Sequence, residues 1–255
     1  MKLGFEEQKQ HYTSGSQSAR TKTESWASAN LFCPNCGHNS LNQFPANLPV
    51  ADFYCVQCQE QYELKSQKKP FGRKVANGAY DVKIRRLESE SSPSLFLLHY
   101  NDLTSSVQSL SVIPKRFFVP SIVERRKPLR ASARRAGWVG SNIVIEKVPK
   151  VGRISIIADQ NIRRIPEVCK EWRSTNFLDQ KRKETRGWLC EVMACIDQFE
   201  NQEFSLADAY TFEPQLSELY PGNLNIRPKI RQQLQVLRDN GYLKFLGRGR
   251  YCLSK

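Results

Sequence analysis

Four of the cysteines fall into two pairs of the same spacing. Two residues separate Cys33 from Cys36, and two residues separate Cys55 from Cys58. This spacing lets both sulfurs of a pair reach one tetrahedral ion, and two such pairs supply the four thiolates that close the coordination shell of Zn²⁺. A closed shell leaves no position for a substrate. The sequence therefore predicts a structural zinc site that braces a region with a small core of its own.

Two other kinds of site use cysteines in related patterns. Four thiolates also bind iron–sulfur clusters. A redox dithiol of the thioredoxin type uses a single C-x-x-C pair in a β-α-β setting rather than a matched pair. We favour zinc because the spacing is that of zinc ribbons. His38 follows closely, but four cysteines are sufficient ligands.

Two carboxylates and an amine surround the second cysteine pair. Asp52 precedes Cys55, and Glu63-Leu64-Lys65 follows Cys58. Because alternate side chains of a strand share a face, Glu63 and Lys65 are expected to point the same way. If the cysteine loop folds the segments on either side of it into a hairpin, Asp52 approaches both of them.

This constellation suits the hydrolysis of a phosphodiester. Carboxylates at a strand end hold Mg²⁺ while phosphate and water complete the shell. The metal would polarise the phosphate and acidify a bound water, and the ammonium of Lys65 would orient that water and offset developing charge. The alternative is a surface salt bridge on a hairpin, which the common E-x-K pattern alone favours. Asp52 upstream and the basic chain shift the balance toward a nuclease.

The composition limits the classes of protein. The chain has 255 residues, with 39 Lys+Arg against 25 Asp+Glu and a formal charge of +14, which favours polyanionic partners such as nucleic acid. Its 40% hydrophobic content excludes wholesale disorder. No apolar run is long enough to cross a bilayer, and residues 1–19 lack the apolar core of a signal peptide. We expect a cytoplasmic protein without disulfides, membrane contact or a small-molecule cofactor.

The first part of the chain alternates helical and strand patterns. Helices are expected from about residue 18 to 28 and over residues 80–90, and basic loops over residues 67–78 and 114–137. We place a domain junction between residues 160 and 185, where the sequence is charged and mixed. Short strands are expected at residues 52–54, 62–65, 95–100, 108–113, 142–145 and 153–158.

The last part reads as three helices and a hairpin. One helix follows Arg186, and a second opens at Ser205 with a capping-box pattern that ends in Asp208. The third spans residues 226–240, with Ile230 and Leu234 on its apolar face. Two strands, at residues 242–245 and 250–253, then flank Gly247-Arg248-Gly249. This order is typical of a winged helix.

A winged helix reads DNA with its third helix and its hairpin. The residues of that helix that are candidates for base edges and phosphates are Arg227, Lys229, Arg231, Gln232 and Gln233. Arg248 and Arg250 of the hairpin are expected to hold backbone phosphate, which supplies affinity without sequence information.

A tryptophan between glycines is a further candidate reader. Trp138 follows Gly137 and lies two residues before Gly140, which suits an indole on a loop that approaches DNA closely. The alternative is a core tryptophan that covers the sheet. Arg134 and Arg135 would contact phosphate or guanine, or belong to a solvated basic loop.

The acidic residues also carry a family resemblance. Pro49-Val50-Ala51-Asp52, followed by Glu63-Leu64-Lys65, resembles the PD-(D/E)xK nuclease motif, with two extra residues between proline and aspartate. Over nearly its whole length the chain resembles the DpnI-type methyl-directed restriction endonucleases. The further segments that carry this resemblance are Cys33-Pro-Asn-Cys36-Gly37, the ADFYC run, Gly78-Ala79-Tyr80, Arg134-Arg-Ala-Gly-Trp138 and Ile230-Arg-Gln-Gln-Leu-Gln.

The resemblance implies an α/β (α+β) fold with two domains. Residues 1–180 would form a PD-(D/E)xK catalytic domain with an inserted four-cysteine zinc site, and residues 181–255 a winged helix. Asp52 and Glu63 would be the Mg²⁺ carboxylates and Lys65 the catalytic lysine, while Glu24 on the first helix is an extra acidic residue that the motif does not fix.

The resemblance also implies the substrate. It implies Mg²⁺-dependent cleavage of double-stranded DNA at GATC that contains N6-methyladenine, and the methyl requirement comes from the resemblance alone. An N6-methyl group adds apolar bulk in the major groove. We expect a monomer in solution. The other hypotheses are a non-catalytic zinc-containing winged-helix regulator and a repair nuclease that acts on another DNA structure.

Overall fold

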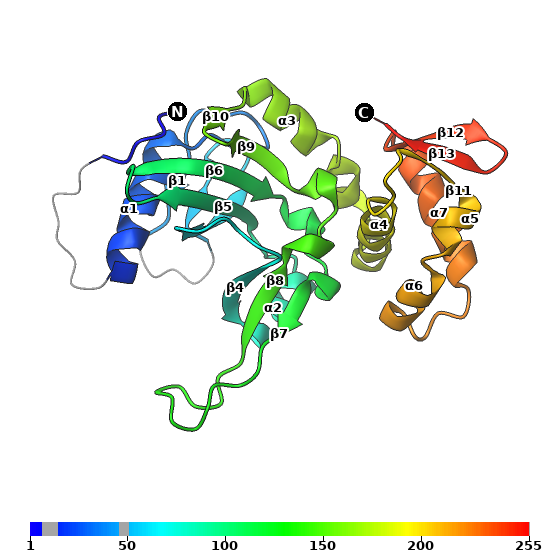
Figure 1. Cartoon of the computed structure of the whole chain (residues 1–255), viewed down its shortest axis with the longest axis horizontal. Helices are drawn as coiled ribbons and strands as arrows, with labels where there is room; N and C mark the ends of the chain where they lie inside the picture. Colours follow the sequence, from blue (N-terminus) through cyan, green and yellow to red (C-terminus); the bar gives the residue numbers. More distant parts are fainter. Residues whose placement is uncertain (7–14, 46–50, 255) are drawn as a thin grey trace.

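The centre of the fold is a mixed sheet in the first two thirds of the chain (Figure 1). The computed structural model describes residues 1–6, 15–45 and 51–254. Strand β3 pairs in parallel with β5, and the other neighbours in this sheet are antiparallel. In the order in which they lie side by side, the strands are β1 (Asn42–Gln43), β2 (Phe53–Tyr54), β3 (Gln61–Gln67), β5 (Ser94–Asn101), β6 (Ser106–Ile113), β9 (Ile154–Ala158) and β10 (Asn161–Ile162).

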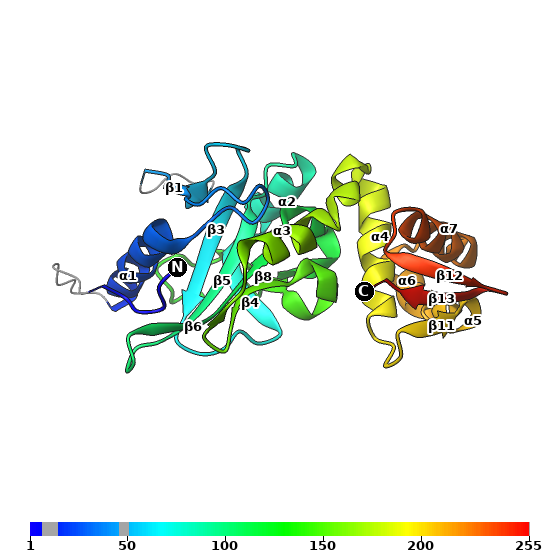
Figure 2. The same ribbon diagram turned by 90° about the horizontal axis from the view of Figure 1, so that it is seen from above.

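At its central strand β5, which is apolar at successive positions, the sheet is covered on both faces. Phe96 and Leu98 pack into one apolar cluster, together with side chains of α1 (Gly15–Asn30) and α3 (Ile165–Arg173). Leu95 and Leu97 point to the opposite face and join a second cluster. Figure 2 shows α1 beside β3 at one end of this sheet. The mixed α/β architecture expected from the sequence is present.

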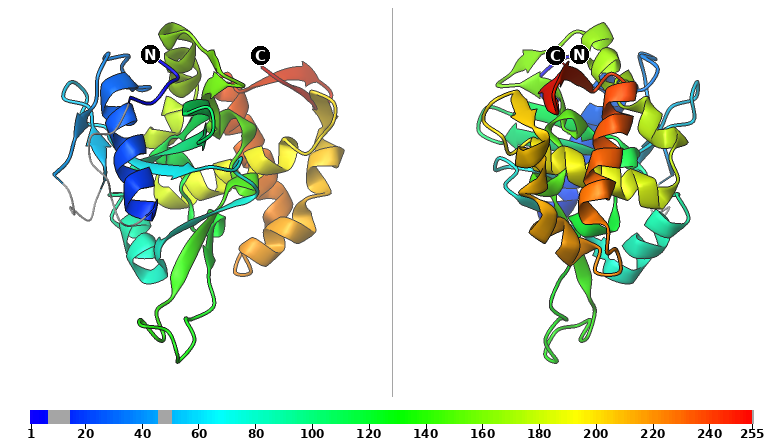
Figure 3. Two further views of the ribbon diagram at one scale, coloured as in Figure 1. Left: turned by 60° about the vertical axis from the view of Figure 1, so that its left-hand side comes forward. Right: turned by 90° about the vertical axis from the view of Figure 1, so that its right-hand side faces the viewer.

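The parallel pair requires a crossover, and the crossover contributes one strand to a second, smaller sheet. After β3 the chain forms β4 (Lys74–Ala79) and α2 (Tyr80–Glu88) before it enters β5. Strand β4 pairs with β8 (Gly140–Val144), which also pairs with β7 (Val123–Arg125). Between β7 and β8, residues 126–139 form an arm that projects from the body of the molecule in both views of Figure 3.

Two of the expected loops are partly wrong. Residues 74–78 of the expected basic loop 67–78 belong to β4, an edge strand in which only Val75 is buried. Residues 115–125 of the expected surface loop 114–137 contribute Phe117 and Ile122 to the core and contain β7. These side chains are placed by 3-10 turns rather than by a long helix or strand, so no period of 2 or 3.6 revealed them. The 3-10 turns of the described chain are η1 (Lys115–Phe117), η2 (Pro120–Ile122), η3 (Ile145–Lys147), η4 (Lys150–Gly152) and η5 (Asn176–Gln180).

The last part of the chain is mainly helical and ends in a hairpin. The capping box is confirmed, since the Ser205 side chain accepts from the Asp208 backbone N–H and the Asp208 carboxylate accepts from the Ser205 N–H. The single helix expected after Ser205 is wrong, because the chain breaks before Pro214 and makes two short helices. The elements are α4 (Lys183–Ile196), β11 (Glu203–Ser205), α5 (Leu206–Tyr210), α6 (Glu213–Leu219), α7 (Ile226–Asp239), β12 (Leu243–Gly247) and β13 (Arg250–Leu253).

Helix α4 joins the two parts of the molecule. Its Trp188 and Leu189 belong to the same buried cluster as Phe117 of the first part and Leu234 of α7. Apolar packing is therefore continuous across the region where the sequence indicates a junction. Among the described helices, none is long and apolar enough to span a membrane.

Candidate functional site

The two cysteine pairs lie in turns of the same backbone design. In the first turn the Cys33 N–H donates to the His38 carbonyl, and the Gly37 N–H donates to the Cys33 carbonyl. The second turn repeats both bonds, from Cys55 to Glu60 and from Gln59 to Cys55. The fifth residue of each turn is left-handed, with φ of 82° at Gly37 and 60° at Gln59. Each pair of sulfurs is thus presented by a tight knuckle.

The knuckles bring the four sulfurs together. Their Sγ atoms all lie within 4.8 Å of one another. The Cys33–Cys58 and Cys36–Cys55 Sγ distances are 3.5 Å and 3.6 Å, close to the roughly 3.8 Å between ligands of a tetrahedron with Zn–S bonds of about 2.3 Å. Asn35 Nδ2 also donates to the Cys58 sulfur, at 3.4 Å, as outer groups do to metal-bound thiolates. The donor set fits a metal ion such as zinc.

The second knuckle folds its flanking segments into the expected hairpin. β2 and β3 pair antiparallel, with Phe53 opposite Tyr62. The Asp52 N–H donates to the Tyr62 carbonyl at 2.9 Å, which extends the ladder by one residue. Asp52 therefore lies across from Glu63, on strands whose spacing brings opposed side chains together. Pro49 and Val50 of the motif lie outside the described residues.

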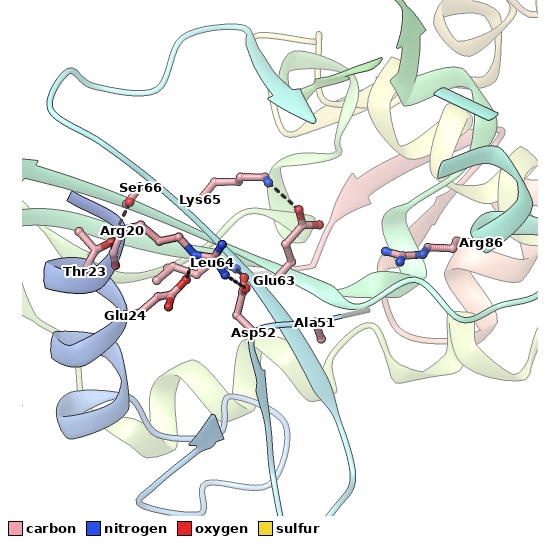
Figure 4. A pocket seen from close by; sticks show the side chains of 10 residues that line it. All are labelled: Arg20, Thr23, Glu24, Ala51, Asp52, Glu63, Leu64, Lys65, Ser66 and Arg86. Carbon is pink, nitrogen blue, oxygen red and sulfur yellow. Dashed lines mark hydrogen bonds and ion pairs between the residues drawn. The ribbon is translucent and has the colours of Figure 1, made fainter. Parts of the chain in front are cut away.

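Asp52, Glu63 and Lys65 line one cleft of about 320 Å³. Figure 4 shows the Glu63 carboxylate turned toward Lys65, and its Oε1 lies 2.6 Å from Lys65 Nζ. Asp52 Oδ2 accepts the Leu64 backbone N–H at 2.7 Å. The three side chains that the sequence singled out are thus in one place, and two of them already form an ion pair.

Helix α1 adds charged residues to the same cleft. Glu24 lines it, as does Arg20, one turn earlier on the helix. Arg20 Nε donates to Glu24 Oε1 at 2.5 Å, and its Nη2 lies 3.8 Å from Asp52 Oδ1. Glu24 was among the residues considered from the sequence, whereas Arg20 was missed. The signal was available, because residues four apart on a helix share a face.

The cleft shifts the pKa values of the two facing acids in opposite directions. Burial raises the pKa of Asp52, and the nearby Glu24 and Glu63 carboxylates add to this effect against the opposing Leu64 N–H bond. Burial also works to raise the pKa of Glu63, but the attraction of the Lys65 ammonium outweighs it and leaves that pKa lowered. Glu63 is therefore held ionised, while a cation near Asp52 would favour the ionised form of its carboxyl group.

The cleft is also lined by carboxylate oxygens, although among the described residues only the four cysteines bring their ligand atoms within 4.8 Å of one another. Three carboxylates line the cleft, those of Glu24, Asp52 and Glu63. Carboxylate oxygen is the donor that Mg²⁺ prefers, and it leaves positions for water and phosphate. Arg20, Lys65 and Arg86 supply the cationic side of the same cleft.

Helix α2 carries a buried lysine close enough to Glu63 to interact with it electrostatically. Lys83 is 5% exposed, and its Nζ lies 4.3 Å from the centre of the Phe118 ring. Burial lowers the pKa of Lys83 to about 8, although the Glu63 carboxylate acts in the opposite direction. Lys83 lies on the helix expected over residues 80–90, and no pattern in the sequence indicated that its side chain is buried.

The tryptophan between glycines lies at the base of the projecting arm. Trp138 is half-buried rather than buried, and the Arg135 guanidinium lies over its ring at 4.7 Å. Backbone bonds between Leu129 and Trp138 and between Gly137 and Leu129, each 3.0 Å, hold the arm closed on itself. A Cβ placed on Gly140 of β8 would meet the indole at 2.8 Å, so Trp138 packs against the small sheet with one side and is only partly covered. The exposed basic residues of the arm are Arg126, Lys127, Arg130, Arg134 and Arg135.

In α7, four of the five expected DNA-reading side chains are exposed or half-buried. Arg227, Arg231 and Gln232 are exposed, and Lys229 is half-buried with its Nζ 5.9 Å from the Trp188 ring centre. Arg227 is tied to Glu213 at 2.7 Å. Ile230 and Leu234 are buried, as expected.

Gln233 differs from its expected role. It is 1% exposed, and its Oε1 has no hydrogen-bond partner in the described part of the chain. The reason is helical periodicity, since Gln233 lies seven residues after Ile226 and so on the buried stripe. In the hairpin, Arg248 is exposed at the tip, and Arg250 is exposed and paired with Glu203 at 2.9 Å.

Comparison with protein families identifies both parts of the chain. The DpnI model, described as the Dam-replacing family, matches residues 1–181. The DpnI_C model, described as the Dam-replacing HTH domain, matches residues 184–252. The first match covers well over half of the sequence, and the resemblance read from the motifs is thereby confirmed: the chain belongs to the DpnI family of restriction endonucleases and carries that family's helix-turn-helix domain.

Proposed function

We propose that the protein is a type II methyl-directed endonuclease that hydrolyses double-stranded DNA at GATC containing N6-methyladenine, with Mg²⁺. The observation that carries the proposal is the meeting of Asp52, Glu63 and Lys65 in one cleft. Family membership supports a restriction endonuclease. The GATC sequence and the methyl requirement rest on the resemblance. We also propose that the mixed sheet is a PD-(D/E)xK core and that the two domains divide near residue 181.

In this proposal Asp52 and Glu63 hold Mg²⁺, and Glu24 is a third carboxylate within the same cleft. When bound, the ion polarises the phosphate and acidifies a water molecule. Lys65 donates a hydrogen bond to the attacking water or to a phosphate oxygen and offsets the negative charge that develops there. The raised pKa of Asp52 falls as a cation approaches, because opposite charge favours the carboxylate.

The cysteine site has a structural role in the proposal. The second knuckle connects β2 to β3, the two strands that align Asp52 with Glu63. Zn²⁺ bound by the four thiolates would therefore fix the hairpin that carries both acids. No step of the reaction is assigned to this metal.

Two regions are proposed to read the DNA. The arm carries five exposed basic residues and the half-buried Trp138, which offers an apolar surface for a methyl group in the major groove. The exposed residues Arg227, Arg231 and Gln232, with the half-buried Lys229, form the contact face of α7, and Arg248 and Arg250 of the hairpin reach phosphates. Two readings of one methylated sequence multiply discrimination, since each mismatch costs about 1–3 kcal/mol. We propose a monomer in solution.

Digestion of plasmid DNA tests the proposal. Protein with Mg²⁺ is expected to cut plasmid from a host that methylates adenine in GATC and to leave unmethylated plasmid whole. Asp52→Ala should abolish cleavage while binding to methylated duplex is retained. Asp159→Ala is the matched control, since this exposed aspartate lies outside the cleft.

The outcomes separate the hypotheses. Binding without cleavage by the unaltered protein would leave the non-catalytic regulator. Equal cleavage of both plasmids would leave a nuclease whose substrate is another DNA structure.

A further inference from the structure

One buried tyrosine contacts both the cysteine site and the acids of the cleft. Tyr62 of β3 is 0% exposed and comes directly before Glu63 in the chain. Its hydroxyl lies 3.1 Å from Cys33 Sγ. Its backbone carbonyl accepts the Asp52 N–H at 2.9 Å. The same residue therefore reaches the cysteine site with its side chain and holds a residue of the cleft with its backbone.

Aromatic neighbours fix the position of the Tyr62 ring. The ring stacks on Phe96 of β5, with centroids 4.7 Å apart and an interplanar angle of 25°. The Trp172 ring of α3 lies 6.2 Å away. Within the residues that the structure describes, the hydroxyl makes its single hydrogen bond to Cys33 Sγ. A buried hydroxyl is costly to leave unbonded, so the packing of the ring aims this polar group at the sulfur.

A metal ion at the cysteines would fix the direction of this hydrogen bond. Between a hydroxyl and a thiol, either atom can donate. A cysteine that ligates a metal ion is a thiolate and has no proton to give. Tyr62 would then be the donor and Cys33 Sγ the acceptor. A hydrogen bond to an ionised acceptor is roughly twice as strong as one between neutral groups, so the bond would gain strength when the metal binds.

The charge of a zinc-loaded site calls for such donors. Zn²⁺ with four thiolates is an anion, and the side chains of Cys33 and Cys55 are 0% exposed. Negative charge in a buried place is costly unless hydrogen bonds are made to it. Asn35 donates to the Cys58 sulfur from within the first knuckle. Tyr62 is a second side-chain donor, and it comes from the strand that carries Glu63.

We propose that Tyr62 is a positioning residue that couples the cysteine-bound metal to the cleft. Its hydroxyl donates to the metal-bound Cys33 thiolate, and the strand held in this way keeps Asp52 across from Glu63. This role rests on the metal site of the proposed function, but not on the DNA sequence or the methyl group that the protein reads. Loss of the metal weakens the bond from Tyr62 and loosens β3 where it borders the cleft.

Tyr62→Phe removes the hydroxyl and keeps the ring that stacks on Phe96. Groups that hydrogen-bond to metal ligands typically change metal affinity 10–100-fold, so the affinity for zinc should fall at least about tenfold. Competition with a chromophoric chelator measures this affinity on the full chain. Tyr54→Phe is the matched control, because Tyr54 lies in the same hairpin and its hydroxyl faces Asn42 Nδ2, at 3.5 Å. This control should bind zinc as the parent does.

Cobalt in place of zinc gives a readout that a merely structural role of Tyr62 would not move. Co²⁺ bound by thiolates absorbs light as charge passes from sulfur to metal. A hydrogen bond to the thiolate lowers the energy of the sulfur electrons, so its loss should shift this absorption to longer wavelength. The shift is expected in Tyr62→Phe, whereas Tyr54→Phe should have the spectrum of the parent.

Cleavage of methylated plasmid tests the coupling to the cleft. With rising amounts of a zinc-selective chelator, Tyr62→Phe should lose cleavage at about one tenth of the concentration that the parent tolerates. An unchanged zinc affinity or an unchanged cobalt spectrum in Tyr62→Phe would overturn the proposal, as would cleavage that persists after the metal has left.

The same measurements separate this proposal from the proposed function. A parent protein that binds neither metal would refute the metal site and the role of Tyr62 together. Failure of the plasmid digest alone would refute the nuclease and leave the zinc and cobalt titrations to decide whether Tyr62 donates to the thiolate.

Discussion

Loss of one sulfur of the proposed zinc site should unfold the region that carries the acids. Cys58→Ala leaves three thiolates at a site whose sulfurs are spaced for four. A ligand at about 1,000 times its Kd stabilises the folded state by roughly 4.1 kcal/mol, which is lost if the variant no longer retains the metal. For a chain of this size, each kcal/mol lowers the melting temperature by about 2–4 °C, so we expect a fall of roughly 8–16 °C.

Three measurements check this expectation. Metal content is read by released zinc with a colorimetric chelator, stability by thermal unfolding, and function by plasmid cleavage. The variant should contain less than one zinc and lose cleavage, because β2 and β3 flank the knuckle. Cys252→Ala, a half-buried cysteine in β13, is the control and should keep its metal and its activity. A Cys58→Ala protein that melts and cleaves like the parent would refute the role of the metal in positioning Asp52 and Glu63.

Three further predictions follow from buried polar groups. Burial raises the pKa of Asp52, so the ionised carboxylate destabilises the fold as pH rises above the usual aspartate range. Asp52→Asn should therefore raise the free energy of unfolding in urea more at pH 7 than at pH 4. The same variant should abolish cleavage. Lys83 binds its proton less tightly when folded, with a pKa of about 8 against 10.5, so stability should rise between pH 8 and 10. Lys83→Met should remove this rise and increase the free energy of unfolding at pH 7 by up to about 3 kcal/mol. A parent protein whose stability does not change between pH 8 and 10 would contradict the burial effect. Gln233→Leu should raise the free energy of unfolding by about 1–2 kcal/mol and leave the DNA affinity unchanged, because the Gln233 side chain is buried with an unpaired oxygen. Gln232→Leu, at an exposed position of the same helix, should instead weaken DNA binding, as measured by fluorescence anisotropy with a methylated duplex.

The local chemistry of the site was predictable from the sequence. The C-x-x-C spacing predicts the meeting of the four sulfurs, and the alternation of a strand predicts that Glu63 and Lys65 share a face. The hairpin that aligns Asp52 with Glu63 follows from the knuckle between them. All of these inferences concern one short stretch of the chain, residues 33–65, in which motif spacing and a single hairpin decide the geometry.

The missed features depend on contacts between distant segments. Val75 is the single buried residue of β4, so the strand has no alternating pattern and exists through its pairing with β8. Helix α3 is short and charged, and we assigned its residues to a junction, although Val168 and Trp172 pack under the sheet. A cavity lined by Ser92 and Arg186 joins segments about 95 positions apart, a proximity that no local pattern reports.

The mixed pairing of β3 has a consequence for the order in which the chain assembles. On one side, β3 pairs with β2, and only the short cysteine knuckle separates these two strands in the chain. On the other side, β3 pairs with β5, with Tyr62 beside Ser94, and β4 and α2 lie between these two strands in the chain. Short loops close sooner than long ones. During synthesis, the β2–β3 hairpin with a metal ion bound at the cysteines would thus form first, and the later strands would pair with it. Depletion of zinc during synthesis should therefore lower the yield of newly folded protein before it affects protein that has already folded.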